Sequence, residues 1–320
     1  MTHRRLHTLL STLALPLLGV LGCGDDDGGG GGPVPDQAHV AATVLVDPAA
    51  ARLHDAFPDW TQDDRLLVFN GTPGGNVWRV DAAGGTPVAL TDTLNTSWTA
   101  GAYKPGCLAE GRVAFYQVRG TGNDRAMHIM TVDTAAVSGV PAPTSLRRFT
   151  GTAVGLSGNQ TSEPQTLSFS RYARRLAGLW RTPWLMEWGY EGDAEPVVSR
   201  SPTFMREATD VRISRDGLRV AFVDAEKKVS WLEYESDDHA EVTVIGEGVS
   251  PSWSGDGAVI GYLDNDGDYV VYALETAVAT VYEATALQLS RPVLSWAGDR
   301  IAYLVRSDEK VGLAVGTLVP

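Results

Sequence analysis

Cysteine and positive charge are both scarce in this sequence. Two cysteines, Cys23 and Cys107, occur among 320 residues, and 26 lysines and arginines face 39 acidic residues, which gives a formal net charge of −13 at pH 7. An acidic surface repels phosphate backbones, so we expect no nucleic-acid partner. It also disfavours electrostatic docking on anionic lipids, so membrane attachment requires another source of binding energy.

The sequence also lacks the common signatures of a catalytic or metal site. After the amino-terminal segment its histidines are His39, His54, His128 and His239, and they share no metal-ligand spacing. No G-x-S-x-G motif, which marks a nucleophile elbow, is found. We therefore expect no cofactor and no bound metal, and we assign no catalytic residue.

Long apolar runs are scarce as well, and the clearest one lies near the amino terminus. Arg4 and Arg5 precede a largely apolar stretch from Leu9 to Leu21, which is too short for an ordinary transmembrane helix and is typical of a signal peptide. The stretch ends in Leu18-Gly19-Val20-Leu21-Gly22-Cys23, which resembles a bacterial lipobox. The resemblance implies cleavage after residues 1–22 and lipidation of Cys23. The alternative is an ordinary signal peptide with an incidental cysteine.

Residues 23–38 have the composition of a flexible tether. Gly24-Asp25-Asp26-Asp27 is followed by five glycines, Gly28 to Gly32, and this stretch has almost no apolar content to bury. In lipoproteins an Asp directly after the lipidated Cys favours retention in the inner membrane. Because Gly24 stands there, the resemblance implies a lipid-anchored protein of the bacterial cell envelope at the outer membrane. Without Arg4 and Arg5, the mature chain has 24 basic and 39 acidic residues and a formal charge of −15.

The rest of the chain consists of copies of one pattern, which we call units. Each unit has a bulky or apolar position, the slot, then a polar turn, then an apolar-small-aromatic triplet such as Val220-Ala221-Phe222 or Ile260-Gly261-Tyr262. The slots are Trp60, Cys107, Phe169, Ile213, Trp253 and Leu294, at spacings of 47, 62, 44, 40 and 41 residues. A repeat of this period with several short strands per unit indicates a β-propeller.

The strand pattern predicts how the ring closes. Each unit contains four short strands; the outer strand of the fourth unit is expected at 240–245, and the innermost strand of the fifth ends at Trp253. The sixth unit lacks an outer strand after Thr317, whereas the run 40–46 has strand propensity and no unit of its own. We therefore expect this run to lie antiparallel to 311–317, with Val44 and Val46 buried. The predicted fold is all-β, a six-bladed β-propeller of four-stranded antiparallel blades over residues 39–320.

The turns of several units resemble a known repeat. Ser214 to Phe222 has the form Ser-x-Asp-Gly-x-x-Val-Ala-Phe, and Trp253-Ser254-Gly255-Asp256-Gly257 is similar. Both resemble the WD40-like PD40 repeats of TolB and its relatives, which implies a propeller over about residues 40–320. TolB also has an amino-terminal α/β domain, for which there is no room between the tether and the first unit. Its partner-binding role is therefore not implied for this chain.

Polar residues before the innermost strands are candidates for a binding face around the central channel. They are His54, Asp55, Glu163, Arg206, Glu207, Asp210 and Arg291. A mixed-charge solvated rim is one interpretation, and a lyase or hydrolase site is the other.

Three further features each allow two interpretations. Asp264, Asp266 and Asp268 form either a Ca²⁺ site or an ordinary acidic turn. The tryptophans around the hairpin 180–190 form either core between blades or a platform for a sugar or peptide. Cys107 is interpreted as a buried apolar thiol rather than a nucleophile.

These observations favour a monomeric, lipid-anchored binding or scaffold module for a protein or an envelope polymer. The alternative hypothesis is a propeller enzyme that acts on an extracellular or envelope polymer at the channel face, and a close grouping of His54, Glu163, Glu207 and Arg291 would favour it.

Overall fold

The computed structural model describes most of the repeat region. The described residues are 38–46, 53, 58–71, 76–91, 103–119, 126–135, 144–149, 164–180, 182–189, 196–234, 241–307 and 310–320. Cys23, the predicted signal peptide and nearly all of the tether lie outside them. None of the helices within these ranges is long and apolar enough to cross a membrane.

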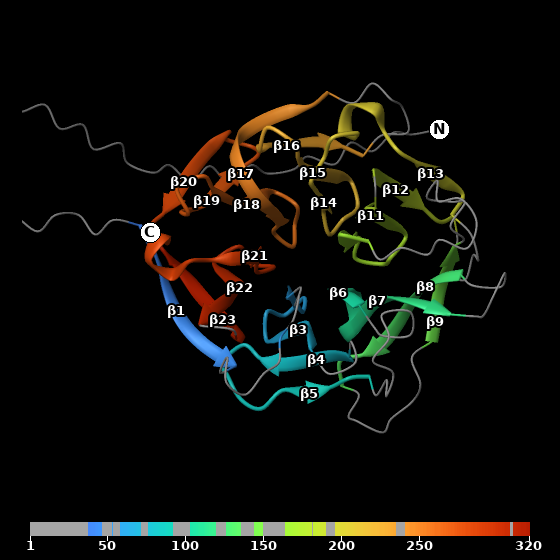
Figure 1. Cartoon of the computed structure of the whole chain (residues 1–320), viewed down its shortest axis with the longest axis horizontal. Helices are drawn as coiled ribbons and strands as arrows, with labels where there is room; N and C mark the ends of the chain where they lie inside the picture. Colours follow the sequence, from blue (N-terminus) through green and yellow to red (C-terminus); the bar gives the residue numbers. More distant parts are fainter. Residues whose placement is uncertain are drawn as a thin grey trace, which may run out of the picture. The chain divides into compact units, whose positions relative to one another are not determined.

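The strands form antiparallel sheets arranged around a common axis (Figure 1). Four of these sheets have four strands, as in the blades of a propeller. The first unit contains β2 (Asp59–Trp60), β3 (Leu66–Gly71), β4 (Asn76–Asp81) and β5 (Val88–Ala89). The second contains β6 (Tyr103–Cys107), β7 (Arg112–Arg119), β8 (Ala126–Asp133) and β9 (Thr144–Phe149). The third contains β10 (Thr166–Phe169), β11 (Arg175–Leu179), β12 (Pro183–Glu187) and β13 (Val198–Arg200).

The sixth unit is completed from the other end of the repeat region. Its strands are β21 (Ser290–Leu294), β22 (Arg300–Ser307), β23 (Lys310–Val319) and β1 (His39–Val46). β1 pairs antiparallel with β23, from His39 opposite Val319 to Val46 opposite Leu313. The predicted closure by the run 40–46 is therefore confirmed.

The fourth and fifth units differ from the prediction because they share a strand. They form one seven-stranded sheet of β14 (Asp210–Ile213), β15 (Arg219–Val223), β16 (Lys228–Glu233), β17 (Thr243–Trp253), β18 (Val259–Asp264), β19 (Tyr269–Ala273) and β20 (Val278–Tyr282). Residues 243–247 of β17 pair with β16, and residues 248–253 pair with β18. The expected outer strand of the fourth unit and innermost strand of the fifth are thus one continuous strand. No connecting loop separates them, so the sheet does not divide there.

One burial prediction for β1 is wrong. Val46 is 5% exposed, but Val44 is 59% exposed. The register with β23 shifts between Val44 and Val46, which turns Leu45 and Val46 inward together and leaves Val44 facing outward. A bulge of this kind breaks the strict alternation on which the prediction relied.

The Ser-x-Asp-Gly pattern has a structural cause. A hydroxyl begins five of the turns, and its oxygen accepts a hydrogen bond from the backbone N–H five residues later. The pairs are Thr61 with Leu66 (3.0 Å), Ser170 with Arg175 (3.0 Å), Ser214 with Arg219 (2.9 Å), Ser254 with Val259 (3.0 Å) and Ser295 with Arg300 (3.1 Å).

The same turn geometry explains the acid at the third position and the glycine at the fourth. Where the third position is an acid, its carboxylate accepts a hydrogen bond from the turn hydroxyl, as in Ser214 Oγ to Asp216 Oδ1 at 2.5 Å and Ser254 Oγ to Asp256 Oδ1 at 2.6 Å. The fourth residue is in the left-handed region, with φ of 78° at Gly217 and 69° at Gly257. Glycine suits this position because it has no Cβ to clash. The motif thus specifies a tight turn between the first two strands of a unit.

Apolar residues fill the space between neighbouring sheets. Trp180 and Trp188 are buried with Tyr116 and Met127 in a cluster between the second and third units, and Trp184 packs against it. The interpretation of these tryptophans as core is therefore confirmed.

The acidic turn of the fifth unit is held by its own hydrogen bonds. Asp264 Oδ1 accepts from the backbone N–H groups of Asp266 and Asp268, each at 2.9 Å. Asp268 Oδ1 accepts from Ala284 N at 2.9 Å and from the Thr285 hydroxyl at 2.8 Å, at the start of η5 (Thr285–Leu287). The backbone hydrogen bond from Ala284, followed by the Thr285 hydroxyl, lowers the pKa of Asp268 below its ordinary value. These contacts fit the ordinary acidic turn, which ties β19 to the connection after β20.

The two valines of β1 provide a matched test of ring closure. Val46→Ala should lower the free energy of unfolding by about 2 kcal/mol, because it removes buried methyl groups and leaves a cavity. Val44→Ala should change it by less than about 0.5 kcal/mol, because its side chain already contacts water. Denaturant unfolding of both variants measures the difference, and equal losses would contradict the observed pairing of β1.

Candidate functional site at the ring axis

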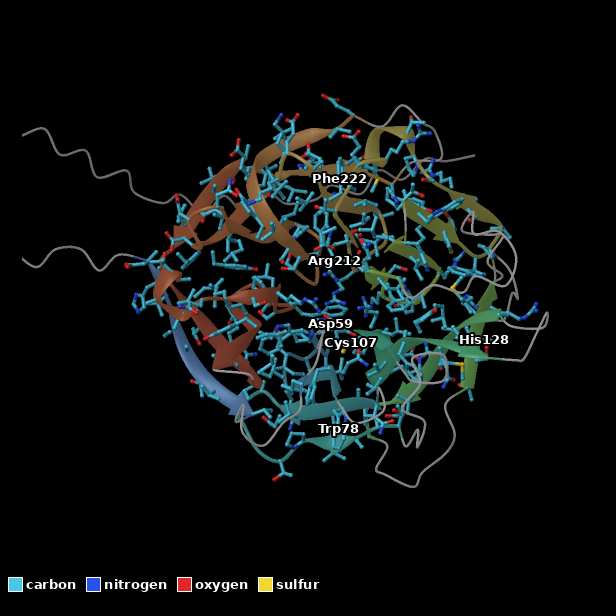
Figure 2. All side chains as sticks on the ribbon, viewed as in Figure 1. Asp59, Trp78, Cys107, His128, Arg212 and Phe222 are labelled. Atoms are coloured by element: carbon cyan, nitrogen blue, oxygen red, sulfur yellow. The ribbon has the colours of Figure 1, made fainter. Side chains whose placement is uncertain are left out.

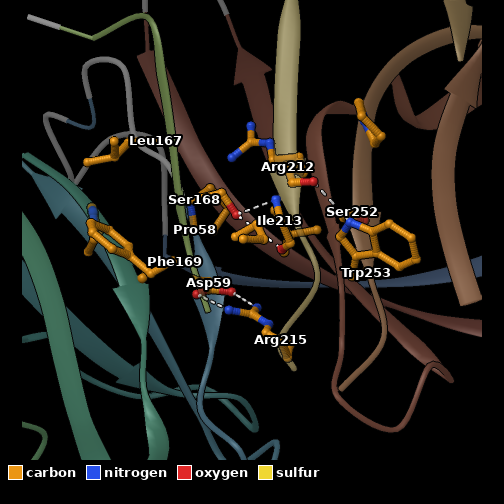
Figure 3. Close-up of a pocket in the computed structure, with 14 residues that line it drawn as sticks. Pro58, Asp59, Leu167, Ser168, Phe169, Arg212, Ile213, Arg215, Ser252 and Trp253 are labelled. Carbon is orange, nitrogen blue, oxygen red and sulfur yellow. Dashed lines mark hydrogen bonds and ion pairs between the residues drawn. The ribbon is translucent and has the colours of Figure 1, made fainter. Parts of the chain in front are cut away.

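The innermost strands bring the slots together around the axis. Trp60, Cys107, Phe169, Ile213, Trp253 and Leu294 are all buried. The residues just before several slots line a cavity of about 40 Å³ (Figure 3). Asp59, Ser168, Arg212, Ser252 and Val293 are among them. Such a space accepts a few water molecules rather than a sugar or a peptide.

A buried ion pair crosses this axis. Asp59 lies in β2 of the first unit, whereas Arg215 lies in the turn after β14 of the fourth unit, on the far side of the ring. Arg215 Nη1 donates to Asp59 Oδ2 at 2.8 Å, and Nη2 donates to Oδ1. Figure 3 shows the two side chains facing each other, and they are 6% and 8% exposed. The pair therefore joins units that are distant in both sequence and ring position.

Both charges have further partners. Asp59 accepts hydrogen bonds from the backbone N–H groups of Cys107, at 2.7 Å, and Trp60, at 3.0 Å. The Arg215 guanidinium lies 5.3 Å from the centre of the Trp296 ring. Burial alone would lower the pKa of Arg215, but the charge and hydrogen bonds of Asp59 raise it above its ordinary value. A buried pair with such additional contacts meets the conditions under which its desolvation cost is offset.

Hydrogen bonds also connect neighbouring innermost strands. Ser168 Oγ accepts from Ile213 N at 3.2 Å, and Ser252 Oγ accepts from Leu294 N at 3.0 Å. The indoles of two slots donate to the preceding unit, with Trp60 Nε1 to Val293 O at 2.9 Å and Trp253 Nε1 to Arg212 O at 3.1 Å. Side chains at and before the slots therefore bind the units to one another, which the sequence analysis did not predict.

The second and third units meet by packing instead. Gly106, just before the Cys107 slot, lies against the Phe169 ring, where an added Cβ would be 2.6 Å from Phe169 Cδ2. Together with the bond from Cys107 N to Asp59, these contacts link every innermost strand to the next.

A second set of links was also missed by sequence reasoning. An arginine stands directly before the triplet in several units, and it donates to the fourth turn residue of the next unit. Arg175 Nη1 reaches Gly217 O at 2.8 Å, Arg219 Nη1 reaches Gly257 O at 3.1 Å, and Arg300 Nη2 reaches Asp64 O at 2.8 Å. The recurrence of Arg before the triplet was the available sequence signal.

The predicted channel-face residues are only partly described. His54, Asp55 and Glu163 lie outside the described residues. The close grouping of His54, Glu163, Glu207 and Arg291 that would favour a propeller enzyme is therefore not tested. Arg206 and Glu207 are exposed in the connection after η4 (Thr203–Met205). Arg291 does not precede its innermost strand but lies within β21, half-buried, at a left-handed φ of 52°.

Asp210 also lies within its strand, β14. Its carboxylate pairs with Arg212 at 3.2 Å, and Arg212 lies close to the axis, as do Asp59 and Cys107 (Figure 2). Across the described ranges, no three His, Cys, Asp or Glu side chains group in a way that would hold a metal ion. The polar groups at the axis are engaged chiefly in joining strands.

Comparisons with known proteins identify the fold. No protein-family model and no curated protein matches the sequence. Among solved structures, a luciferin-regenerating enzyme is similar with a TM-score of 0.54 and 10% identity, over 87% of this chain and 95% of that one. An oligogalacturonate lyase in complex with manganese has a TM-score of 0.50 and 13% identity, over 82% of this chain and 76% of that one. TolB from Acinetobacter baumannii has a TM-score of 0.50 and 13% identity, over 88% of this chain and 63% of that one. At this level of identity the similarity shows the fold alone: the chain is an all-β propeller of four-stranded antiparallel blades.

Cys107 is buried, as expected, and its surroundings at the axis predict that its thiol is unreactive in the folded protein. Burial and the nearby charge of Asp59 raise the pKa of the Cys107 thiol well above its ordinary value, so it stays protonated at pH 8. In a Cys23→Ser chain, Cys107 is the remaining thiol, and Ellman's reagent at pH 8 should react with it only as fast as the protein unfolds. Protein in guanidinium chloride serves as the fully reactive control. Rapid stoichiometric labelling of the native protein would contradict this description of the axis.

Proposed function

We propose that this protein is a binding or scaffold module for a protein or an envelope polymer. The observation that supports it most is the occupied axis, where the Asp59–Arg215 pair and the bonds between slots leave a cavity of about 40 Å³. A partner of macromolecular size must therefore contact the outer faces of the ring. A ring that is rigid before binding loses little conformational freedom on binding, which favours a recognition role.

The proposal includes a count of six blades. The seven-stranded sheet is counted as two blades that share β17, since its two halves pair separately with β16 and β18. The turns of Ser214 and Ser254, which carry the PD40-like pattern, begin the second strand of each half. This count gives each of the six sequence units one blade, in a propeller that acts as a monomer.

The proposal also places the ring at a membrane surface. Residues 1–22 serve as a lipoprotein signal peptide, Cys23 carries the lipid, and residues 23–38 form a tether that holds the ring away from the outer membrane of a bacterial envelope. Because the mature chain has a formal charge of −15, attraction to anionic lipid cannot replace the acyl chains.

A single pair of proteins tests both parts of this proposal. The full chain should sediment with envelope membranes, whereas the Cys23→Ser chain should be soluble; unchanged fractionation would contradict lipid anchoring. The soluble form, crosslinked in envelope extract, should capture a partner that excess unlabelled ring displaces. Failure to capture any displaceable partner across crosslinkers of several lengths would contradict the binding role.

A further inference from the structure

A second cavity lies on the face that carries the turns between the first and second strands of the units. We call this the turn face. Successive strands of a unit are antiparallel, so the connections between units, including the one with Arg206, lie on the opposite face. The cavity has a volume of about 390 Å³ and lies between the turn of the third unit and the turn of the fourth. This volume is within the range of small-ligand sites, about 300–1,000 Å³.

The third unit departs from the repeat at this cavity. Its turn reads Ser170-Arg171-Tyr172-Ala173, whereas the fourth unit has Ser214-Arg215-Asp216-Gly217. Tyr172 thus replaces the acid that accepts the turn hydroxyl, and Ala173 takes the left-handed position with φ of 51°. Both replacements are unfavourable for the turn itself, and Tyr172 is 52% exposed, so core packing does not account for it. Such local departures are expected where a protein has a functional surface.

Arginines line the cavity, although the chain as a whole is acidic. The Arg171 guanidinium lies 5.3 Å from the Tyr172 ring centre; its Nε is buried, and its two terminal nitrogens make no hydrogen bond or ion pair among the described residues. Arg174 is exposed and donates one hydrogen bond, from Nη2 to Gly189 O at 2.9 Å. Arg171 and Arg174 therefore retain donors for a ligand, and a guanidinium matches the two oxygens of a carboxylate.

The other charges of the cavity are already paired. Arg175 Nε lies 3.1 Å from Glu187 Oε2, and Nη1 donates to Gly217 O in the turn of the fourth unit. The Arg175 guanidinium also lies 4.4 Å from the Tyr234 ring centre. Asp216 accepts from the Ser214 hydroxyl and from Leu218 N, and Arg219 lies 3.7 Å from it. Three arginines against two carboxylates leave one positive charge among the lining residues. That balance suits a single carboxylate better than a phosphate chain.

Apolar surface flanks the arginines. Tyr172 and Leu218 both line the cavity and are 52% and 55% exposed. A ligand that places an apolar side chain on these two residues and a carboxylate on Arg171 and Arg174 would bury apolar area and pair its charge.

We propose that this cavity binds a peptide segment of a protein partner in which an acidic side chain is next to an apolar one. The inference rests on the proposed binding function and specifies its partner class. Arg171 and Arg174 hold the carboxylate, and Tyr172 and Leu218 contact the apolar side chain.

The probe is a blocked tetrapeptide of alternating glutamate and leucine, added to the soluble Cys23→Ser chain and followed by ligand-observed NMR. We expect saturable binding with a dissociation constant of about 1 mM or tighter, weakened by added salt. The same peptide with glutamine in place of glutamate should bind about tenfold more weakly. Absence of saturable binding by the glutamate peptide would overturn the assignment.

Variants separate binding from folding. Arg171→Gln and Arg174→Gln should each weaken peptide binding about tenfold. Tyr172→Asp restores the repeat motif, so it should preserve or raise the melting temperature while abolishing binding. Arg65→Gln is the matched control, because Arg65 is an exposed arginine at the same turn position of the first unit as Arg174 in the third, outside the cavity, and this variant should bind as the parent does. If the cavity variants bind as well as Arg65→Gln does, the assignment of this site is overturned.

Two outcomes distinguish this inference from the function on which it rests. If the Tyr172→Asp ring still captures the displaceable envelope partner as well as the parent does, the binding function stands and the cavity is not its site. If galacturonate binds through Arg171 and Arg174 and the peptide does not, the cavity takes a sugar acid and the peptide assignment is overturned.

Discussion

The ring depends on one buried ion pair, between Asp59 and Arg215. Transfer of two charges from water to an interior costs several kcal/mol per ion, so the pair is tolerated only with good geometry and additional partners. The N–H groups of Cys107 and Trp60 and the ring of Trp296 supply them, and they come from the first, second and sixth units. The charges are therefore satisfied only when the first, second, fourth and sixth units are in place together.

Shorter-range bonds extend this constraint to the rest of the ring. Slot indoles and hydroxyls join neighbouring innermost strands, arginines before the triplets join neighbouring turns, and β1 closes the last sheet on β23. Because sheets of this kind contact mainly their neighbours, links at the axis and at the turns fix their relative angles. The result is a ring whose interior is occupied and whose faces are held rigidly. This is why we place recognition on a face, at the turns of the third and fourth units, rather than in the channel.

The sequence was sufficient to predict features that depend on local chemistry. The hydroxyl-acid-glycine turn, the apolar triplets and the strand propensity of 40–46 each have a short-range cause, and they led to the propeller and its closure. Features that depend on the assembled ring were not predictable in this way. The turn position of Arg215 varies among the units, as Gln62, Arg171, Gly255 and Trp296, and only closure brings Arg215 to Asp59. The bulge at Val44 and the continuous β17 depend on pairing partners, which periodicity does not specify. The sequence pattern did not single out Tyr172, whose position beside Arg171 and the turn of the fourth unit is a property of the folded ring.

A double-mutant cycle on Asp59 and Arg215, followed by denaturant unfolding of the Cys23→Ser chain, tests most directly whether their pairing holds the ring together. Asp59→Asn and Arg215→Leu should each lower the free energy of unfolding by about 3–5 kcal/mol, because each leaves the opposite charge buried without its partner. The double variant should lose less than the sum of the two, by about 2 kcal/mol, because no unpaired charge remains. Losses that add within about 0.5 kcal/mol would mean that Asp59 and Arg215 act independently, and would contradict the claim that their pairing holds the ring together.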